Sequence, residues 1–196
     1  METDRYHLVM ARTDSEIAAV AAAQFHEHGI NSTGVDALAR AAGISKRTLY
    51  QRFGSKDGLI VAAYESLDRP VYEMFTRPAE AATDDPAGQI DALFAGLEHA
   101  VTMPEFRGCP FSNAAAELAD PAHPAHRVVR RHKERLRKWM RVRLRDAGSA
   151  DAERASRQLA VLWAGAQAQA MVQRSAAPVR DARSLARSVV LETNAT

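Results

Sequence analysis

The chain has 196 residues, enough for a small domain joined to a larger one, each with its own hydrophobic core. Lysine and arginine total 26 against 24 acidic residues, so the formal net charge of +2 does not by itself indicate a nucleic-acid partner. One cysteine excludes an internal disulfide framework, and no apolar run is long enough to span a bilayer. We therefore expect a cytoplasmic protein without a membrane partner.

The first predicted helix follows a short N-terminal arm. Thr13 and Glu16 have the spacing of a capping box, in which each side chain bonds the other residue's backbone amide. Apolar residues then recur at helical spacing through Phe25, and Gly29 ends the helix. Residues 1–12, which include Arg5 and Arg12, are expected to be a loosely held arm.

Two short helices with a tight turn between them are predicted next. The spacing of Thr33 and Asp36 predicts another capping box, and Gly43 supplies the residue that most easily ends a helix. Ser45 caps the second helix, in which Leu49 and Phe53 lie one turn apart and point inward. The opposite face is polar and basic, as in a helix-turn-helix whose second helix enters the DNA major groove.

The residues of this segment resemble the DNA-binding signature of the TetR family of bacterial repressors. The matching elements, in order, are Ala42-Gly43-Ile44-Ser45-Lys46, Thr48-Leu49-Tyr50, Phe53 and Ser55-Lys56-Asp57. The signature covers about a quarter of the chain. The resemblance implies an all-helical homodimer that binds a palindromic operator and responds to a small-molecule effector held in its C-terminal body.

The resemblance and the outward position of the side chains also predict DNA contacts. Base edges and nearby phosphates are assigned to Lys46, Arg47, Thr48 and Gln51, and phosphates to Tyr50, Lys56 and Thr33. Many relatives carry histidine where this chain has Gln51 and a small residue where it has Arg47. Since glutamine pairs with adenine and arginine with guanine, the base preference is expected to be distinctive.

The body is expected to be helical throughout. Ser55 caps a fourth helix, which Pro70 should kink or end near Arg69, and residues 77–86 are expected to form a loop. Asp85 and Pro86 open a fifth helix, a short helix is centred near Ala114, and a long one covers about residues 125–147. One face of that long helix is strongly basic, and it is either a solvated surface or a second DNA contact. Its basic residues are Arg130, Arg131, Arg135, Lys138, Arg141 and Arg145.

The last two predicted helices suggest how copies of the chain associate. Residues 150–173 are apolar nearly all round, so one side of that helix must be covered by something outside its own domain. Pro178 opens a final helix with another apolar stripe. The TetR resemblance implies that these two helices pair with their mates in a four-helix dimer bundle.

An effector pocket is expected between the body helices, because such pockets are mostly apolar. Its candidate lining residues, each of which could equally be plain core, are Phe94, Cys109, Phe111, Trp139, Met140, Trp163, Gln167 and Met171. Cys109 precedes a helix start, where a thiolate would be stabilised. It is therefore either a small buried residue or a sensor of oxidants and electrophiles.

No catalytic site is predicted. His123 and His126 have a metal-ligand spacing, but Pro124 breaks the helical geometry between them and no cysteine pair accompanies them, so we expect no metal and no cofactor. The predicted division is a DNA-binding domain over residues 1–56 and an effector-binding and dimerisation domain over residues 57–196. The alternatives are a repressor triggered at Cys109 and, in another class, a helical carrier or enzyme that keeps the head as structure.

Overall fold

The computed structural model describes residues 12–192, and all regular elements within that range are α-helices. Residues 1–11, which make up nearly all of the predicted arm, and 193–196 lie outside the described part. The helices are α1 (Asp14–His28), α2 (Val35–Ala42), α3 (Lys46–Phe53), α4 (Lys56–Ala82), α5 (Pro86–Ala100), α6 (Pro110–Glu117), α7 (Ala125–Asp146), α8 (Ala152–Gln173) and α9 (Ala177–Glu192). The predicted all-α fold is confirmed.

The helix ends of the head mostly follow the predicted capping. Thr13 and Glu16 form the reciprocal capping box of α1, and the Ser45 hydroxyl accepts a hydrogen bond from the Thr48 amide. Gly43 ends α2 with a left-handed backbone (φ 66°). The predicted cap at Thr33 is wrong, because α2 begins after Gly34 without a side-chain cap and the Thr33 hydroxyl donates to the Gly29 carbonyl at 2.6 Å.

Helix α4 is longer than predicted. It continues through Pro70 and Pro78 to Ala82, so the predicted end near Arg69 and the predicted loop from residue 77 are wrong for this stretch. A proline inside a helix costs about 3 kcal/mol locally. Packing of α4 against α1, α5 and α7 along its length offsets that cost, and tertiary contacts therefore decide the helix length.

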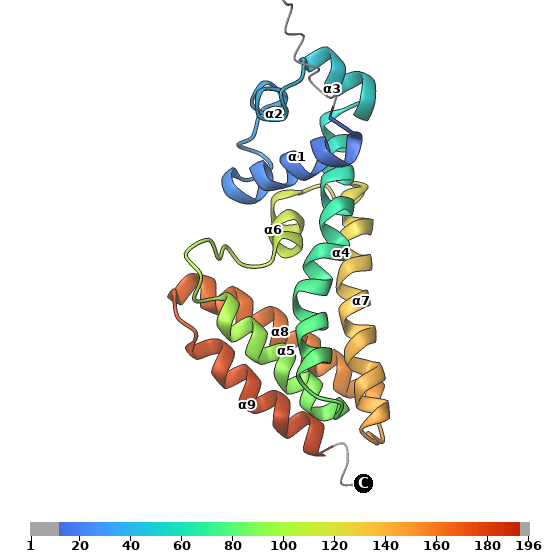
Figure 1. Ribbon diagram of the computed structural model, residues 1–196, viewed down its shortest axis with the longest axis vertical. Coiled ribbons are helices and arrows are strands. Elements are labelled where there is room, and N and C mark those ends of the chain that lie inside the picture. The colour runs from blue at the N-terminus through green and yellow to red at the C-terminus, as the bar shows by residue number, and fades with distance from the viewer. Residues whose placement is uncertain (1–11, 193–196) are drawn as a thin grey trace, which may run out of the picture.

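Two hydrophobic cores lie along α4, which runs from the head to the far end of the body (Figure 1). The head core contains α1 to α3 and the first half of α4, and it also takes in α6 and the start of α7. The body core lies between the second half of α4 and α5, α7, α8 and α9. The head therefore rests on α6 and α7 as well as on α4.

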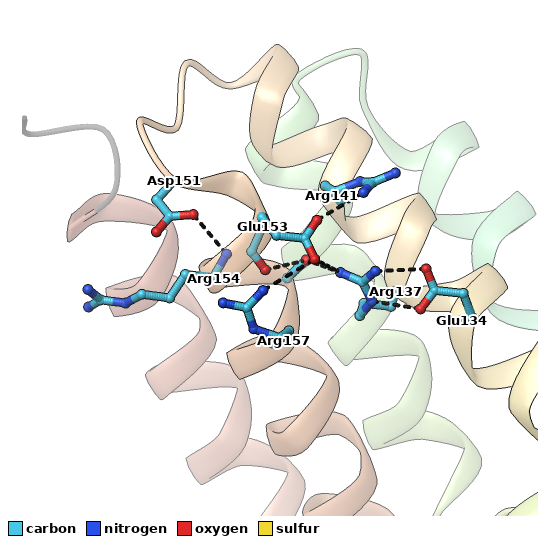
Figure 2. A network of polar contacts seen from close by, with 8 residues as sticks. Glu134, Arg137, Arg141, Asp151, Glu153, Arg154 and Arg157 are labelled. Carbon is cyan, nitrogen blue, oxygen red and sulfur yellow. Dashed lines mark hydrogen bonds and ion pairs between the residues drawn. The ribbon is translucent and has the colours of Figure 1, made fainter.

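A polar network ties α7 to the start of α8 (Figure 2). Glu153 of α8 accepts hydrogen bonds from Arg137 at 2.6 Å and Arg141 at 2.9 Å on α7, and from Arg157 on its own helix at 3.2 Å. Arg137 also holds Glu134. The hydrogen bond from Arg141 lowers the pKa of Glu153, which keeps this carboxylate charged between the two helices.

Within the described part of the chain, no helix combines the length and apolar character that a membrane span requires.

An ion-pair cluster fixes α9 on α5. The Asp91 carboxylate accepts hydrogen bonds from Arg183 at 2.6 Å and from Arg187 at 2.7 Å. The hydrogen bonds from Arg183, and then from Arg187, hold the pKa of Asp91 well below its usual value. A carboxylate whose pKa is lower in the folded state stabilises the fold above its unfolded pKa of about 4, and this contribution is lost as the pH falls further.

We expect Asp91→Asn to lower the free energy of unfolding by about 1 to 2 kcal/mol at neutral pH. The difference from wild type should shrink below about pH 4, where Asp91 of the unfolded chain takes up a proton. Denaturant unfolding at pH 7 and pH 3, at one fixed protein concentration, measures both effects. Asp181→Asn, an exposed position on α9, is the control. A difference that stays constant over this pH range would contradict the assignment.

Candidate functional site

The outer face of α3 is polar, basic and open to solvent. Lys46, Arg47, Tyr50 and Gln51 are all exposed. Arg47 and Gln51 make no hydrogen bond or ion pair with any described residue, whereas the Lys46 ammonium lies 3.2 Å from the Asp36 carboxylate. Arg47 and Gln51 therefore have no partner to give up when they bind DNA. Lys46 must exchange the Asp36 carboxylate for a DNA phosphate or base.

Three other predicted DNA contacts are engaged within the head. Thr48 is half-buried and its hydroxyl lies 2.8 Å from the Ser45 hydroxyl. Thr33 is 3% exposed and its hydroxyl hydrogen is already donated to Gly29. The half-buried Lys56 ammonium donates to the Ile30 carbonyl at 2.7 Å. Thr33 and Lys56 thus hold the turn before α2 in this structure.

No feature of the sequence indicated how α3 is braced. The Arg52 guanidinium, at the far end of α3, donates to the backbone carbonyl of Arg12 and to the Asp14 carboxylate at 3.2 Å. Arg12 in turn donates to the Ala41 carbonyl at the end of α2 at 3.3 Å. These contacts join the start of α1 to both helices of the helix-turn-helix and fix the direction in which α3 presents Arg47.

An apolar cavity of about 450 Å³ lies between the head and the body. Its walls come from α1, α4, the segment 100–110, α7 and α8. Three of the predicted lining residues are found there: Cys109, Trp163 and Gln167. A second, more polar hollow of about 900 Å³ lies beside it, and Met171 belongs to its lining.

The remaining predicted pocket residues belong to the packed core. Phe94 lies edge-on against Trp163 and Phe111 stacks on His132, so each contacts a cavity residue from behind. The Trp139 indole donates to Glu80 at 2.7 Å, and Met140 is fully buried in the body core. None of these four is in the lining of the 450 Å³ cavity, because sequence periodicity identifies a buried face without showing where packing leaves a space.

A buried polar pair connects the cavity to α4. His132 lines the cavity, stacks on Phe111 of α6 and lies with its Nδ1 2.9 Å from the Asp68 carboxylate on α4. Burial lowers the pKa of His132, although the hydrogen bond to Asp68 opposes this shift. A neutral ring donates through Nδ1–H to the carboxylate. Arg131 and Arg135 of α7 also lie within 3.5 Å of the Asp68 carboxylate.

We expect Asp68→Ala to destabilise the fold by about 2 to 4 kcal/mol, because it leaves the buried His132 N–H without an acceptor and removes the link between α4 and α7. Asp68→Asn retains an oxygen acceptor and should cost less. Urea unfolding at fixed protein concentration measures the difference. Equal midpoints for Asp68→Ala and wild type would contradict a structural role for the pair.

The head and body together define a class of helical DNA-binding regulators, and comparisons with known proteins identify the family. The model for bacterial regulatory proteins of the tetR family matches residues 17–63, and the model for the LmrA/YxaF-like transcriptional regulator C-terminal domain matches residues 86–185. The chain therefore belongs to the TetR family of transcriptional regulators. Its members are DNA-binding proteins and not enzymes.

Solved structures agree with this assignment. SCO4454, a TetR-family transcriptional regulator from Streptomyces coelicolor, is 30% identical over 92% of this chain and 96% of that one, with a TM-score of 0.82. A TetR transcriptional regulator from Chloroflexus aurantiacus is 24% identical over 92% and 94%, with a TM-score of 0.79. NemR from E. coli in its reduced form shares the fold at 20% identity over 91% and 97%, with a TM-score of 0.79. Comparison with curated proteins gives no match.

Proposed function

We propose that this protein is a homodimeric repressor that binds a palindromic operator and is released when a small-molecule effector enters the 450 Å³ cavity. The observation that carries the proposal is that this cavity is walled by α1 of the head as well as by α4, α7 and α8 of the body. A ligand there contacts both parts at once. DNA recognition is assigned to residues 1–56, and effector binding and dimerisation to residues 57–196.

Base reading is assigned to the exposed face of α3. Arg47 and Gln51 are the proposed base contacts, with Lys46, Thr48 and Tyr50 at base edges or phosphates beside them. For Thr33 and Lys56, whose polar groups are held within the head, the proposal is a supporting role that presents backbone amides at the start of α2 to a phosphate.

Dimerisation is assigned to the outer faces of α8 and α9. Val161 and Val172 on α8 and Leu185 on α9 are more than half exposed, which leaves an apolar surface on both helices. A shallow groove between the two helices contains Val161 and Leu185, with Arg157 at its edge. A second copy related by twofold symmetry can cover this surface with the same surface of its own.

The proposed response to effector is a change in how the two heads are spaced. A ligand between α1 and the body favours the conformer in which that space is open. It weakens operator binding only as far as it binds the two conformers with different affinity. The buried pair of His132 and Asp68 gives the cavity a direct contact with α4, the helix that carries the head.

Selection of bound sequences from random DNA duplexes tests the DNA function. We expect a palindrome or near-palindrome with half-sites about one helical turn apart or slightly more. A screen for compounds that release the selected duplex then tests the effector function. A helical carrier that keeps the head only as structure would show no preference for base order, and that result would refute the proposal.

A second candidate trigger is modification of Cys109. The Lys133 ammonium lies 3.3 Å from the Cys109 sulfur, which also lines the cavity and precedes the first residue of α6. The neighbouring ammonium and the access from the cavity are the features that support this candidate. Alkylation measured against pH, and DNA release by an electrophile in wild type and Cys109→Ser, test this candidate. Unchanged release in the variant would remove it.

A further inference from the structure

The walls of the cavity are mostly apolar, with a few polar side chains among them. Aromatic side chains supply much of the wall, including Phe75 of α4 and Trp163 of α8, whose rings meet edge to face at 5.1 Å. Lys133 and Gln167 face the same space from α7 and α8. A volume of about 450 Å³ lies within the range that drug-sized ligands occupy. The body of a ligand is therefore apolar, and its polar group must suit these two residues.

Lys133 pairs with no carboxylate of the described residues, unlike Arg131, Arg135 and Arg137 on the same helix. Arg131 and Arg135 share Asp68, and Arg137 binds Glu134 and Glu153. Lys133 is half-buried, and its ammonium has only the Cys109 sulfur within hydrogen-bonding distance among the described residues. An ammonium that lines the cavity without a carboxylate partner would form a charge-assisted hydrogen bond with an anion there.

Gln167 is a second polar group without a partner. The residue is 6% exposed and lines the cavity, yet its side chain makes no hydrogen bond with any described residue. Its amide atoms are not among the fully buried atoms that lack a partner, so they are open to the cavity. Its NH₂ group can donate to an oxygen of the ligand, and this supplies the second observation that the cavity is built for a polar group.

The other titratable residues of the lining do not neutralise Lys133. Glu105 supplies a carboxylate, but it is exposed and makes no ion pair with any described residue, and the lining also contains the exposed Arg107. Burial lowers the pKa of both His26 and His132, so these rings are neutral at pH 7. The cavity therefore keeps a net positive charge at Lys133.

We propose that the effector is an apolar, ring-sized molecule with one acidic oxygen group, such as a carboxylate or an ionised phenol, whose negative charge is bound by Lys133 and hydrogen-bonded by Gln167. This inference rests on the proposed function, since it names the ligand class of the same cavity. It involves no covalent step. In this proposal Cys109 is only a neighbour of the ammonium.

Binding of matched acid and amide probes tests the proposal. The chain has two tryptophans, so Trp139→Phe leaves Trp163 in the cavity wall as the sole indole reporter. Fluorescence titration at pH 7.5 compares 2-naphthoate with 2-naphthamide, and decanoate with decanamide. In this background we expect the acid of at least one pair to bind about 10-fold or more tightly than its amide. Lys133→Met should abolish that preference while leaving amide binding unchanged.

One variant serves as a control. Lys138→Met removes an exposed lysine from the same helix, outside the cavity lining, and should keep the preference. Lys133→Gln replaces Lys133→Met if the latter fails to fold by circular dichroism.

Three outcomes would overturn the proposal: equal affinity for acid and amide, a preference that survives loss of Lys133, or no binding of any of the four probes. Operator binding by the same ligand-free protein is measured in parallel. If operator binding is intact, such a result refutes only the proposal that the ligand is acidic. Loss of base preference would instead refute the proposed function.

Discussion

Replacing Val161 and Leu185 together by aspartate is expected to give a monomer whose affinity for operator DNA is lower by about 100-fold or more. The two side chains are 72% and 55% exposed and lie in the same groove between α8 and α9. In a twofold dimer each substitution occurs twice, so four carboxylates would have to be buried in the interface. Once the chains separate, each head binds a half-site alone and the gain from linked binding is lost.

Sedimentation equilibrium measures the association, and a gel shift on the selected duplex measures the DNA affinity. Val142→Asp is the matched control, because Val142 is an apolar side chain on α7 with 41% exposure that lies outside this groove. The control should remain dimeric with wild-type affinity. A double variant that stays dimeric at low micromolar concentration would show that the chains associate through another surface.

Arg47→Ala is expected to relax the choice of base at one position of each half-site, with a loss of about 1 to 3 kcal/mol in discrimination. Arg47 is exposed on the outer face of α3 and has no partner among the described residues, so nothing in the head competes with guanine for its guanidinium. Since α3 is braced through Arg52, the substitution should leave the position of the helix unchanged.

Competition of cognate, single-substituted and scrambled duplexes at two salt concentrations measures this effect. Arg145→Ala removes an exposed arginine near the end of α7, in the body, and should change neither affinity nor preference. Equal losses on cognate and scrambled DNA for Arg47→Ala would assign Arg47 to a phosphate instead of a base.

The helix-turn-helix could be predicted almost completely because its signals are local. Thr13, Gly43 and Ser45 act on backbone groups within a few residues, and the structure confirms each of them. Thr33 shows the limit of such signals. It has the spacing of a helix cap, but the turn after Gly29 brings a carbonyl within its reach, and the hydroxyl bonds that carbonyl instead.

The cavity could be predicted only in part. Apolar spacing identified Phe94 and Trp163 as inward-facing, but only Trp163 borders the cavity, while Phe94 packs behind it. Lys133 carried no signal at all, because its lack of a carboxylate partner depends on which acids α4 and α8 bring to the neighbouring arginines.

The sequence by itself determined the fold class, the positions of most helix ends and the polar face of α3, because capping and amphipathic periodicity depend on residues within one or two turns. The tertiary structure decided the length of α4, whose contacts with three other helices outweigh two internal prolines. It also decided the shape and charge of the cavity. An empty volume and an unpaired cation depend on how several helices pack together, and this packing brings together residues that are far apart in the chain.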